Sequence, residues 1–275
     1  MTTVQPVPHV AVRSGDPVWL ADAARVEGLA VVEYAGWLRR GHGDFRDIRG
    51  VMVHHTGSDT ATAASIAEGR PDLPGPLSQL HIARDGTVTT VAAGLAWHAG
   101  AGRYRWLPAD TGNRHTIGIE CANSGTNATA PHRTNWPDAQ YLTLVGCCAA
   151  IMRCLGFSAA RTIGHREYAG RAQGKWDPGA IDTDILRADV QARIGTVPDS
   201  MRLELSRGSV GEAVAKVQRR LKHAYRSYAG HLDVDGVYGP ATEDAVREFQ
   251  RRTPGLRLEG IVGPATAAAL RFTTG

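Results

Sequence analysis

Three residues that lie far apart along the sequence have the types needed to bind one metal ion. His54 and His165 each end a short apolar segment, and Asp177 follows the sequence Gly-Lys-Trp. Two imidazoles and one carboxylate, with one position left open, make the ligand set of a catalytic zinc site. Glu120 and Lys175 could supply a proton acceptor and a cation beside it. These five residues together predict a metal-assisted hydrolase.

The spacing of the histidines limits the kind of metal site that is possible. Neighbouring side chains of a strand point to opposite faces, so only one of His54 and His55 can readily face the ion. The chain has no His-Glu-x-x-His sequence, which excludes that metalloprotease pattern. Spacing alone leaves open the alternative that these histidines are structural or merely exposed.

The elements that must position these residues form the first predicted domain. Short apolar or β-branched segments bounded by Gly, Pro or Asp predict strands at residues 29–33, 50–54, 79–83, 87–92, 116–120 and 162–165. A nearly all-apolar segment predicts a deeply buried helix at 139–155, with Asp138 as its N-cap and Gly156 as its stop. A second helix is predicted at 182–194. Strands mixed with helices on both sides indicate an α/β fold, a mixed central sheet flanked by helices.

A smaller second domain follows a segment of linker composition. Residues 235–242 are echoed 24 residues later by residues 259–266. Each copy is a glycine turn and a Gly-Pro pair, with proline near the start of a helix, at about 241–252 and 265–272. Together with an apolar helical face before them, the copies predict a small C-terminal three-helix module. We therefore expect a catalytic domain at 1–195 (core about 25–195), a linker at 196–202 and the helical module at 203–275.

The composition narrows the class of protein. The chain is 43% hydrophobic and 21% charged, so it can bury a core and is not expected to be disordered. No segment approaches the roughly 20 apolar residues of a membrane span, so no stable membrane insertion is predicted. The cysteines show no Cys-x-x-Cys spacing and are predicted to be buried free thiols: Cys121, Cys147, Cys148 and Cys154.

The net charge of +4 is concentrated in the second domain. Residues 201–275 hold 12 Lys and Arg against 8 Asp and Glu, and the rest of the chain is balanced. A mildly basic module suits an anionic polymer, which could be cell-wall material, a nucleic acid or a membrane surface. No Lys- or Arg-rich block and no nucleic-acid motif is present, so a nucleic acid is not an expected partner.

Six motifs occur in order along the first domain: GVMVHHTG at 50–57, RDGTV at 84–88, AWHAG at 96–100, IGIE at 117–120, GHRE at 164–167 and GKWDPG at 174–179. Together they resemble the zinc N-acetylmuramoyl-L-alanine amidases of the type-2 amidase and peptidoglycan-recognition fold. The C-terminal repeat resembles the peptidoglycan-binding module often attached to wall hydrolases. Residues 1–8 do not read as a secretory signal. The pairing therefore resembles a bacteriophage endolysin, made in the host cytoplasm and acting on the wall after the membrane is breached.

The resemblance implies a role for each residue of the candidate site. His54, His165 and Asp177 would bind Zn2+ as the cofactor, Glu120 would handle the proton of the attacking water, and Lys175 would lie at the metal beside the last ligand. The implied reaction is hydrolysis of the amide bond between N-acetylmuramic acid and L-alanine of the stem peptide. The expected partner is bacterial peptidoglycan, both glycan strand and stem peptide, and the expected state is a monomer.

Further residues are candidates for contact with the substrate. Trp97 and His98 of the AWHAG motif are such candidates, as is Asn123, and core packing is the alternative for the first two. One departure from the family pattern also stands out. Many relatives carry Tyr-His before RDG where this chain has Ser78-Gln79, so no tyrosine can assist catalysis from that position.

Two other functions remain open at the level of the sequence. A non-catalytic peptidoglycan-recognition protein of the same fold typically lacks a zinc ligand, whereas this chain keeps all three. A zinc hydrolase could instead act on another amide, such as a stem-peptide cross-link, but the AWHAG and IGIE motifs argue against it. We therefore predict a peptidoglycan amidase with a wall-targeting module.

Overall fold

The structure, a computed structural model, describes residues 13–127, 129–170, 173–196, 205–253, 256 and 258–270. The chain divides into two compact units: the first runs to Thr196 except for Arg25–Gly28, which group with the second unit, and the second begins at Val197. Most of the predicted linker at 196–202 lies outside the described residues, as do residues 1–12 and the end of the helix predicted at 265–272. No helix in the described part of the chain is long and apolar enough to cross a membrane.

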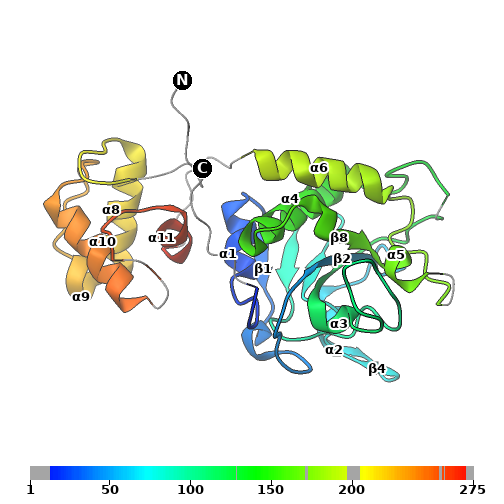
Figure 1. The fold of residues 1–275 in the computed structure, drawn as a ribbon. Helices are drawn as coiled ribbons and strands as arrows, with labels where there is room; N and C mark the ends of the chain where they lie inside the picture. Colours follow the sequence, from blue (N-terminus) through cyan, green and yellow to red (C-terminus); the bar gives the residue numbers. More distant parts are fainter. Residues whose placement is uncertain are drawn as a thin grey trace. The chain divides into compact units, whose positions relative to one another are not determined.

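Six strands of the first unit form one mixed sheet (Figure 1). They are β1 (Val31–Glu33), β2 (Gly50–His55), β5 (Leu80–Ile82), β6 (Val88–Thr90), β7 (Thr116–Cys121) and β8 (Thr162–Gly164). The order in the sheet is β1-β6-β5-β7-β2-β8. Strands β5, β7, β2 and β8 run parallel to one another. Strand β6 is antiparallel to β5, and β1 pairs with β6 in parallel. The predicted mixed central sheet is therefore confirmed.

Helices and a small hairpin complete this unit. The helices are α1 (Leu20–Val26), α2 (Ala63–Glu68), α3 (Gly112–His115), α4 (Asp138–Leu155), α5 (His165–Ala169) and α6 (Thr183–Gly195). Two 3-10 turns, η1 (Trp37–Arg39) and η2 (Ala159–Arg161), and the strand pair β3 (Gly69–Arg70) and β4 (Leu73–Pro74) accompany them. Helices α4 and α6 pack against each other and against the sheet (Figure 1).

Helix α4 is close to its prediction but begins differently. Asp138 is the first helical residue rather than the N-cap, because Pro137 takes the capping position with extended backbone and no side-chain hydrogen bond. Gly156 ends the helix in the left-handed conformation, as predicted. Most of the helix is buried, but Leu142 is 62% exposed. Three of the free cysteines are buried and Cys154 is half-buried.

Strand β2 runs through the middle of the core with alternating faces. Val51 and Val53 belong to the large apolar cluster that includes α4. Met52 belongs to a second cluster with Ile163 and Tyr168, on the other face of the sheet. Because side chains alternate along a strand, His54 lies on the face of Met52 and not on the face that α4 covers.

The described residues of the second unit contain one more helix than predicted. Its helices are α8 (Glu212–Ala224), α9 (Arg226–Ala229), α10 (Pro240–Arg252) and α11 (Pro264–Ala269). The unpredicted α9 has only four residues, too few to leave a periodic pattern. Helices α10 and α11 each begin with the proline of a Gly-Pro pair, as the repeat predicted.

A buried glutamine closes the turn of each repeat copy. Gln218 and Gln250 are 1% and 3% exposed. Their side chains bond to equivalent residues: Gln218 to Gly236, Val237 and Thr242, and Gln250 to Gly260, Ile261 and Thr266. The sequence repeat is thus a repeated hydrogen-bonding unit, in which one amide side chain satisfies the backbone of a tight turn.

Candidate active site

The candidate site lies where the parallel strands end. His54 of β2 pairs in register with Glu120 of β7. His165 directly follows β8, which pairs with β2 as far as Val53 and Gly164. Parallel strands present their carboxyl ends at one edge of the sheet, so three residues from three distant segments meet there.

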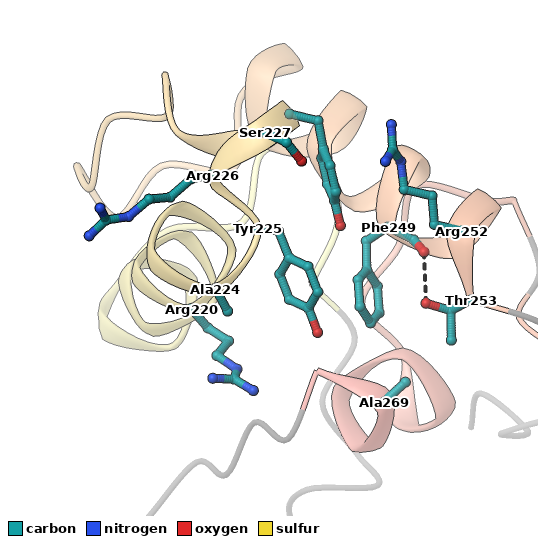
Figure 2. Close-up of a pocket in the computed structure, with 10 residues that line it drawn as sticks. Arg220, Ala224, Tyr225, Arg226, Ser227, Phe249, Arg252, Thr253 and Ala269 are labelled. Carbon is teal, nitrogen blue, oxygen red and sulfur yellow. Dashed lines mark hydrogen bonds between the residues drawn. The ribbon is translucent and has the colours of Figure 1, made fainter.

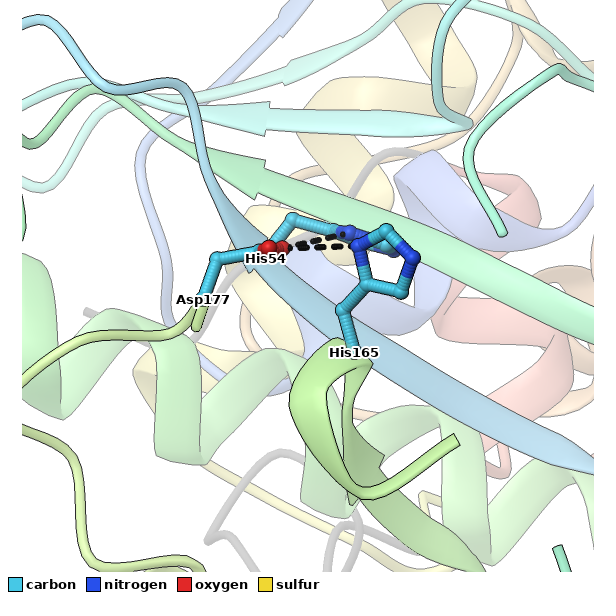
Figure 3. Close-up of side chains that lie close together, drawn as sticks. All are labelled: His54, His165 and Asp177. Carbon is cyan, nitrogen blue, oxygen red and sulfur yellow. Dashed lines mark hydrogen bonds and ion pairs between the residues drawn. The ribbon is translucent and has the colours of Figure 1, made fainter. Parts of the chain in front are cut away.

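His54, His165 and Asp177 converge, as the sequence predicted (Figure 3). The Nδ1 atoms of His54 and His165 each lie 3.0 Å from Oδ2 of Asp177. One possible ligand atom from each residue lies within 4.8 Å of the others, and all three side chains are buried. Such a cluster of nitrogen and oxygen donors has the size and chemistry of a zinc site.

The loop that carries Asp177 is held against the start of α5. Arg166 N–H donates to the carbonyl of Asp177 at 2.8 Å. Pro178 packs so closely on Gly164 that a Cβ there would lie 2.8 Å from the proline Cδ. These contacts bring Asp177 beside His165, twelve residues earlier, and a residue larger than glycine at position 164 would push the loop away.

The protonation states of His54 and Asp177 favour the binding of a cation. Burial lowers the pKa of His54 to about 4, so its ring is neutral at neutral pH. Burial alone would raise the pKa of Asp177, but His165 and His54 outweigh it and lower that pKa below its usual range. The outer Nε2 of His165 donates to the carbonyl of Ala99 at 2.9 Å, so Nδ1 is the nitrogen that faces Asp177. The donors therefore fit a divalent metal ion.

Glu120 is an unpaired acid beside this cluster. Its Oε2 is buried and has no hydrogen-bond partner among the described residues. Burial, and after it the negative charge of Asp177, raises the pKa of Glu120 well above its ordinary value, while the charge of Lys175 opposes the shift. A carboxyl oxygen that is buried without a partner costs free energy and is typical of a catalytic acid or base.

The neighbouring His55 points away from the cluster. Its Nδ1 accepts a hydrogen bond from Gly179 N–H at 2.9 Å, and its ring packs edge-on against Trp176. Gly125 lets the ring approach, since a Cβ there would lie 2.4 Å from it. His55 therefore packs beneath the Asp177 loop, and only His54 of the pair faces the cluster, as the strand geometry predicted.

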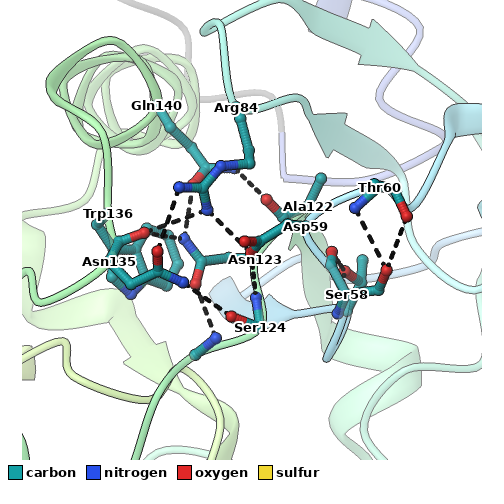
Figure 4. Close-up of polar contacts among 12 residues, drawn as sticks. Ser58, Asp59, Thr60, Arg84, Ala122, Asn123, Ser124, Asn135, Trp136 and Gln140 are labelled. Carbon is teal, nitrogen blue, oxygen red and sulfur yellow. Dashed lines mark hydrogen bonds and ion pairs between the residues drawn. The ribbon is translucent and has the colours of Figure 1, made fainter.

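The three substrate-contact candidates differ in what the structure allows. Trp97 is 39% exposed and stacks on His42 with ring centroids 4.4 Å apart, so one face can still meet a ligand. His98 is buried and hydrogen-bonds to His54. The role of Asn123 stays a prediction: the residue is fully buried, and its amide bonds to Asn135, Gln140 and Gly125 (Figure 4). The amide of Asn123 uses these hydrogen bonds to hold the loop after β7 in place.

Two functional features escaped the sequence reasoning. Asn113 accepts hydrogen bonds from the backbone N–H of His98 and Ala99, at 2.9 and 2.7 Å, and so fixes the segment behind the cluster. Gln79 accepts from Gly118 N–H at 2.6 Å and donates to the carbonyl of Gly94. Asn113 belongs to no motif, and only its partners in space show its role. From the sequence, Gln79 is only a departure from the family pattern, and its hydrogen bonds are visible only in the structure.

The C-terminal module has a basic and aromatic hollow of about 740 Å³ (Figure 2). Its charged lining residues are Arg220, Arg226 and Arg252, and its aromatic ones are Tyr225, Tyr228 and Phe249. The Arg252 guanidinium lies 4.7 Å from the centre of the Tyr228 ring. The described residues that line the hollow include no acid, although Arg252 is paired with Glu248 beside it, so the hollow suits a ligand with negative charge and flat or apolar faces.

Known proteins resemble this chain in both units. Residues 44–180 match the family described as N-acetylmuramoyl-L-alanine amidase, and residues 210–270 match the family described as putative peptidoglycan binding domain. A curated relative, the N-acetylmuramoyl-L-alanine amidase CwlA of Bacillus subtilis (strain 168), is 26% identical over 236 residues. This match covers 73% of this chain and 81% of the relative.

Solved structures of such enzymes also match. A complex of the amidase AmiD from E. coli with a muramyl-peptide substrate is 19% identical, with 85% of this chain and 91% of that chain covered and a TM-score of 0.42. The endolysin amidase LysCS from Clostridium intestinale URNW is 16% identical, with 58% and 94% covered and a TM-score of 0.42. From the two family matches we conclude that the chain carries a domain of the N-acetylmuramoyl-L-alanine amidase family, followed by a domain of the peptidoglycan-binding family.

Proposed function

We propose that this peptidoglycan amidase cleaves the bond between N-acetylmuramic acid and L-alanine with Zn2+ held by His54, His165 and Asp177. The observation that carries the proposal is the convergence of these three buried donors beside Glu120, whose Oε2 has no partner among the described residues. A non-catalytic recognition protein would need neither the unpaired acid nor a complete donor set.

The side chains around the metal position supply the remaining chemistry. Bound there, Zn2+ would polarise the scissile carbonyl and bring the pKa of a water molecule to about 7. Glu120, with its raised pKa, can accept the proton of that water and pass it to the departing amine of L-alanine. Lys175 is exposed on the Asp177 loop, and its charge acts on both Glu120 and His54. It can stabilise the negative oxygen that forms at the carbonyl.

Product analysis tests this reaction. Purified peptidoglycan is digested with the wild-type chain, with and without a chelator, and free amino groups and reducing sugar ends are measured in parallel. We expect new L-alanine amines without new reducing ends, loss of the release on chelation, and recovery on addition of Zn2+. Release of reducing ends, or amines at residues other than L-alanine, would contradict the proposal.

We further propose that the hollow of the C-terminal module is its peptidoglycan-binding site. Arginines can pair with the carboxylates of the stem peptide, and the aromatic rings can contact sugar or peptide faces. Arg226→Glu in the full chain should weaken sedimentation with purified walls. The matched control is Arg219→Glu, on α8 and outside the lining. Equal binding by both variants would place the site elsewhere on the module.

The cellular setting is part of the same proposal. A role as a bacteriophage endolysin, made in the host cytoplasm and reaching the wall after the membrane is breached, agrees with a wall amidase joined to a peptidoglycan-binding domain. The Zn2+ identity and the monomeric state are proposed with it. Metal analysis and light scattering of the purified chain test these two points.

A further inference from the structure

The outer nitrogen of His54 meets an unusual partner. Metal-binding histidines generally donate their second ring N–H to a carboxylate, a backbone carbonyl or water. His165 follows this rule, with Nε2 bonded to the carbonyl of Ala99 at 2.9 Å. The Nε2 of His54 instead lies 3.1 Å from Nδ1 of His98. Only one proton can lie between two such nitrogens, so the proton position on one ring dictates that on the other.

The carbonyl of Thr116 decides which nitrogen carries the proton. His98 Nε2 lies 3.2 Å from that oxygen, and because a carbonyl can only accept, this Nε2 carries a hydrogen. The ring is buried, and among the described residues no carboxylate bonds to it, so it is neutral and its Nδ1 is an acceptor. His54 must then donate from Nε2. The Nδ1 of His54, 3.0 Å from Asp177 Oδ2, is then the nitrogen left to bind a metal ion.

We propose that His98 is a positioning residue for metal binding: by accepting the Nε2 proton of His54, it keeps the Nδ1 lone pair of His54 directed at the metal position. This assignment rests on the proposed metal centre. It gives His98 a role behind the site in place of the predicted contact with substrate.

The surrounding structure supports the same role. Asn113 holds the backbone of both His98 and Ala99 with a single side-chain oxygen. Ala99 in turn provides the acceptor for His165, so one short segment orients both metal-binding histidines. Gly118 leaves room for the His98 ring, because a Cβ there would lie 2.9 Å from two ring carbons.

Nitrogen-15 NMR of the metal-free, full-length chain labelled at histidine reads the tautomers directly. We expect both His54 and His98 to carry hydrogen on Nε2, with none on Nδ1 of His98. A His98 ring protonated at Nδ1 would overturn the proposal. Because this spectrum needs no metal, it separates a failure of the hydrogen-bond chain from a failure of the proposed metal centre. A wild-type chain that bound no Zn2+ despite the expected tautomers would overturn both.

Two variants of His98 separate hydrogen bonding from packing. His98→Gln keeps a donor and an acceptor, whereas His98→Leu keeps only volume. Zn2+ affinity is measured by competition with a chromophoric chelator, and the Co2+ absorption spectrum reports the ligand geometry. We expect affinity about 10–100-fold weaker for His98→Leu, with an altered Co2+ spectrum, and largely restored for His98→Gln.

A matched control and two contrary outcomes complete the test. His132→Leu removes another imidazole, whose nitrogens bond to Asp182 N and Tyr141 Oη and not to the cluster, and should leave affinity unchanged. Wild-type affinity in His98→Leu would contradict the proposal. So would an equal loss in His98→Leu and His98→Gln, which would indicate packing alone. If His98→Leu does not fold, the Zn2+ affinity of His98→Gln and the tautomer spectrum still test the proposed role of His98.

Discussion

The two domains treat their buried polar side chains differently. In the C-terminal module, Gln218 and Gln250 use both ends of their amides to close the repeat turns. In the catalytic domain, Glu120 Oε2 has no partner, and donor atoms of two histidines face Asp177. All buried side-chain atoms without a partner in the described part of the chain belong to the catalytic domain. Satisfied polar groups stabilise a fold, whereas an unsatisfied carboxyl oxygen beside a cluster of donor atoms indicates a place for a ligand or a reacting group.

Among the changes considered, removal of Asp177 should have the largest effect on the catalytic domain. Asp177→Ala takes away the carboxylate that both histidines face, so we expect loss of stoichiometric Zn2+ and amidase activity at background level. Metal analysis and amine release from peptidoglycan measure these effects. Asp184→Ala, which removes an exposed carboxylate at the start of α6, is the control and should behave as wild type. Full activity in Asp177→Ala would exclude the proposed donor set.

Glu120→Gln should lower turnover by about 10²–10⁴-fold with Zn2+ content unchanged. The same variant should not destabilise the fold. The folded-state pKa of Glu120 is raised above its ordinary value of 4.5, so its ionisation costs stability as pH rises past that value. The variant should therefore gain stability relative to wild type between pH 4.5 and 7, measured by chemical denaturation. A loss of stability at pH 7 would mean that Glu120 is structural after all.

Lys175→Met should reduce the rate by about 10²–10³-fold, as expected for loss of one group that stabilises an oxyanion. Steady-state kinetics with a soluble muramyl peptide should show the loss in kcat more than in KM. Zn2+ affinity should stay close to wild type, because Lys175 supplies no ligand. A rate unchanged by Lys175→Met would reduce this residue to a solvated loop cation.

Gln218→Leu tests the module, with the smallest expected effect. It leaves the turn at Gly236 without its partner and should destabilise the module by about 1–3 kcal/mol. All six tryptophans precede residue 197, so tryptophan fluorescence follows the catalytic domain alone, while circular dichroism follows both. We expect an earlier transition in circular dichroism only, and unchanged turnover of a soluble substrate. An unchanged circular dichroism transition would contradict the role of Gln218 in closing this turn.

The sequence was informative where local pattern and chemistry coincide. The apolar segments around His54 and His165 predicted strands that the structure contains, although His165 itself begins α5 instead of ending β8. Alternation along β2 predicted that His54 and His55 would separate. The 24-residue repeat predicted two helices with proline at their starts, and the buried glutamines that close their turns were visible only in the fold.

Other features depend on contacts that no local pattern encodes. Asn123 has the type of a substrate-binding residue, but its amide is used inside the protein. His98 was associated with substrate through its motif, and only its position between Thr116 and His54 indicates a role behind the site. The order of the strands and the function of Asn113 follow from long-range packing, which composition and periodicity do not record.

The pairing of His54 with Glu120 in one register of β2 and β7 has a consequence for how such enzymes diversify. Adjacent strands lie about 4.8 Å apart because backbone hydrogen bonds fix that spacing. The separation between His54, proposed as a metal ligand, and Glu120, proposed as the proton acceptor, is therefore set by the sheet and not by the loops. Insertions and exchanges in the surrounding loops can alter which walls are recognised without changing that separation. New specificities can evolve on this scaffold while the chemistry is inherited intact.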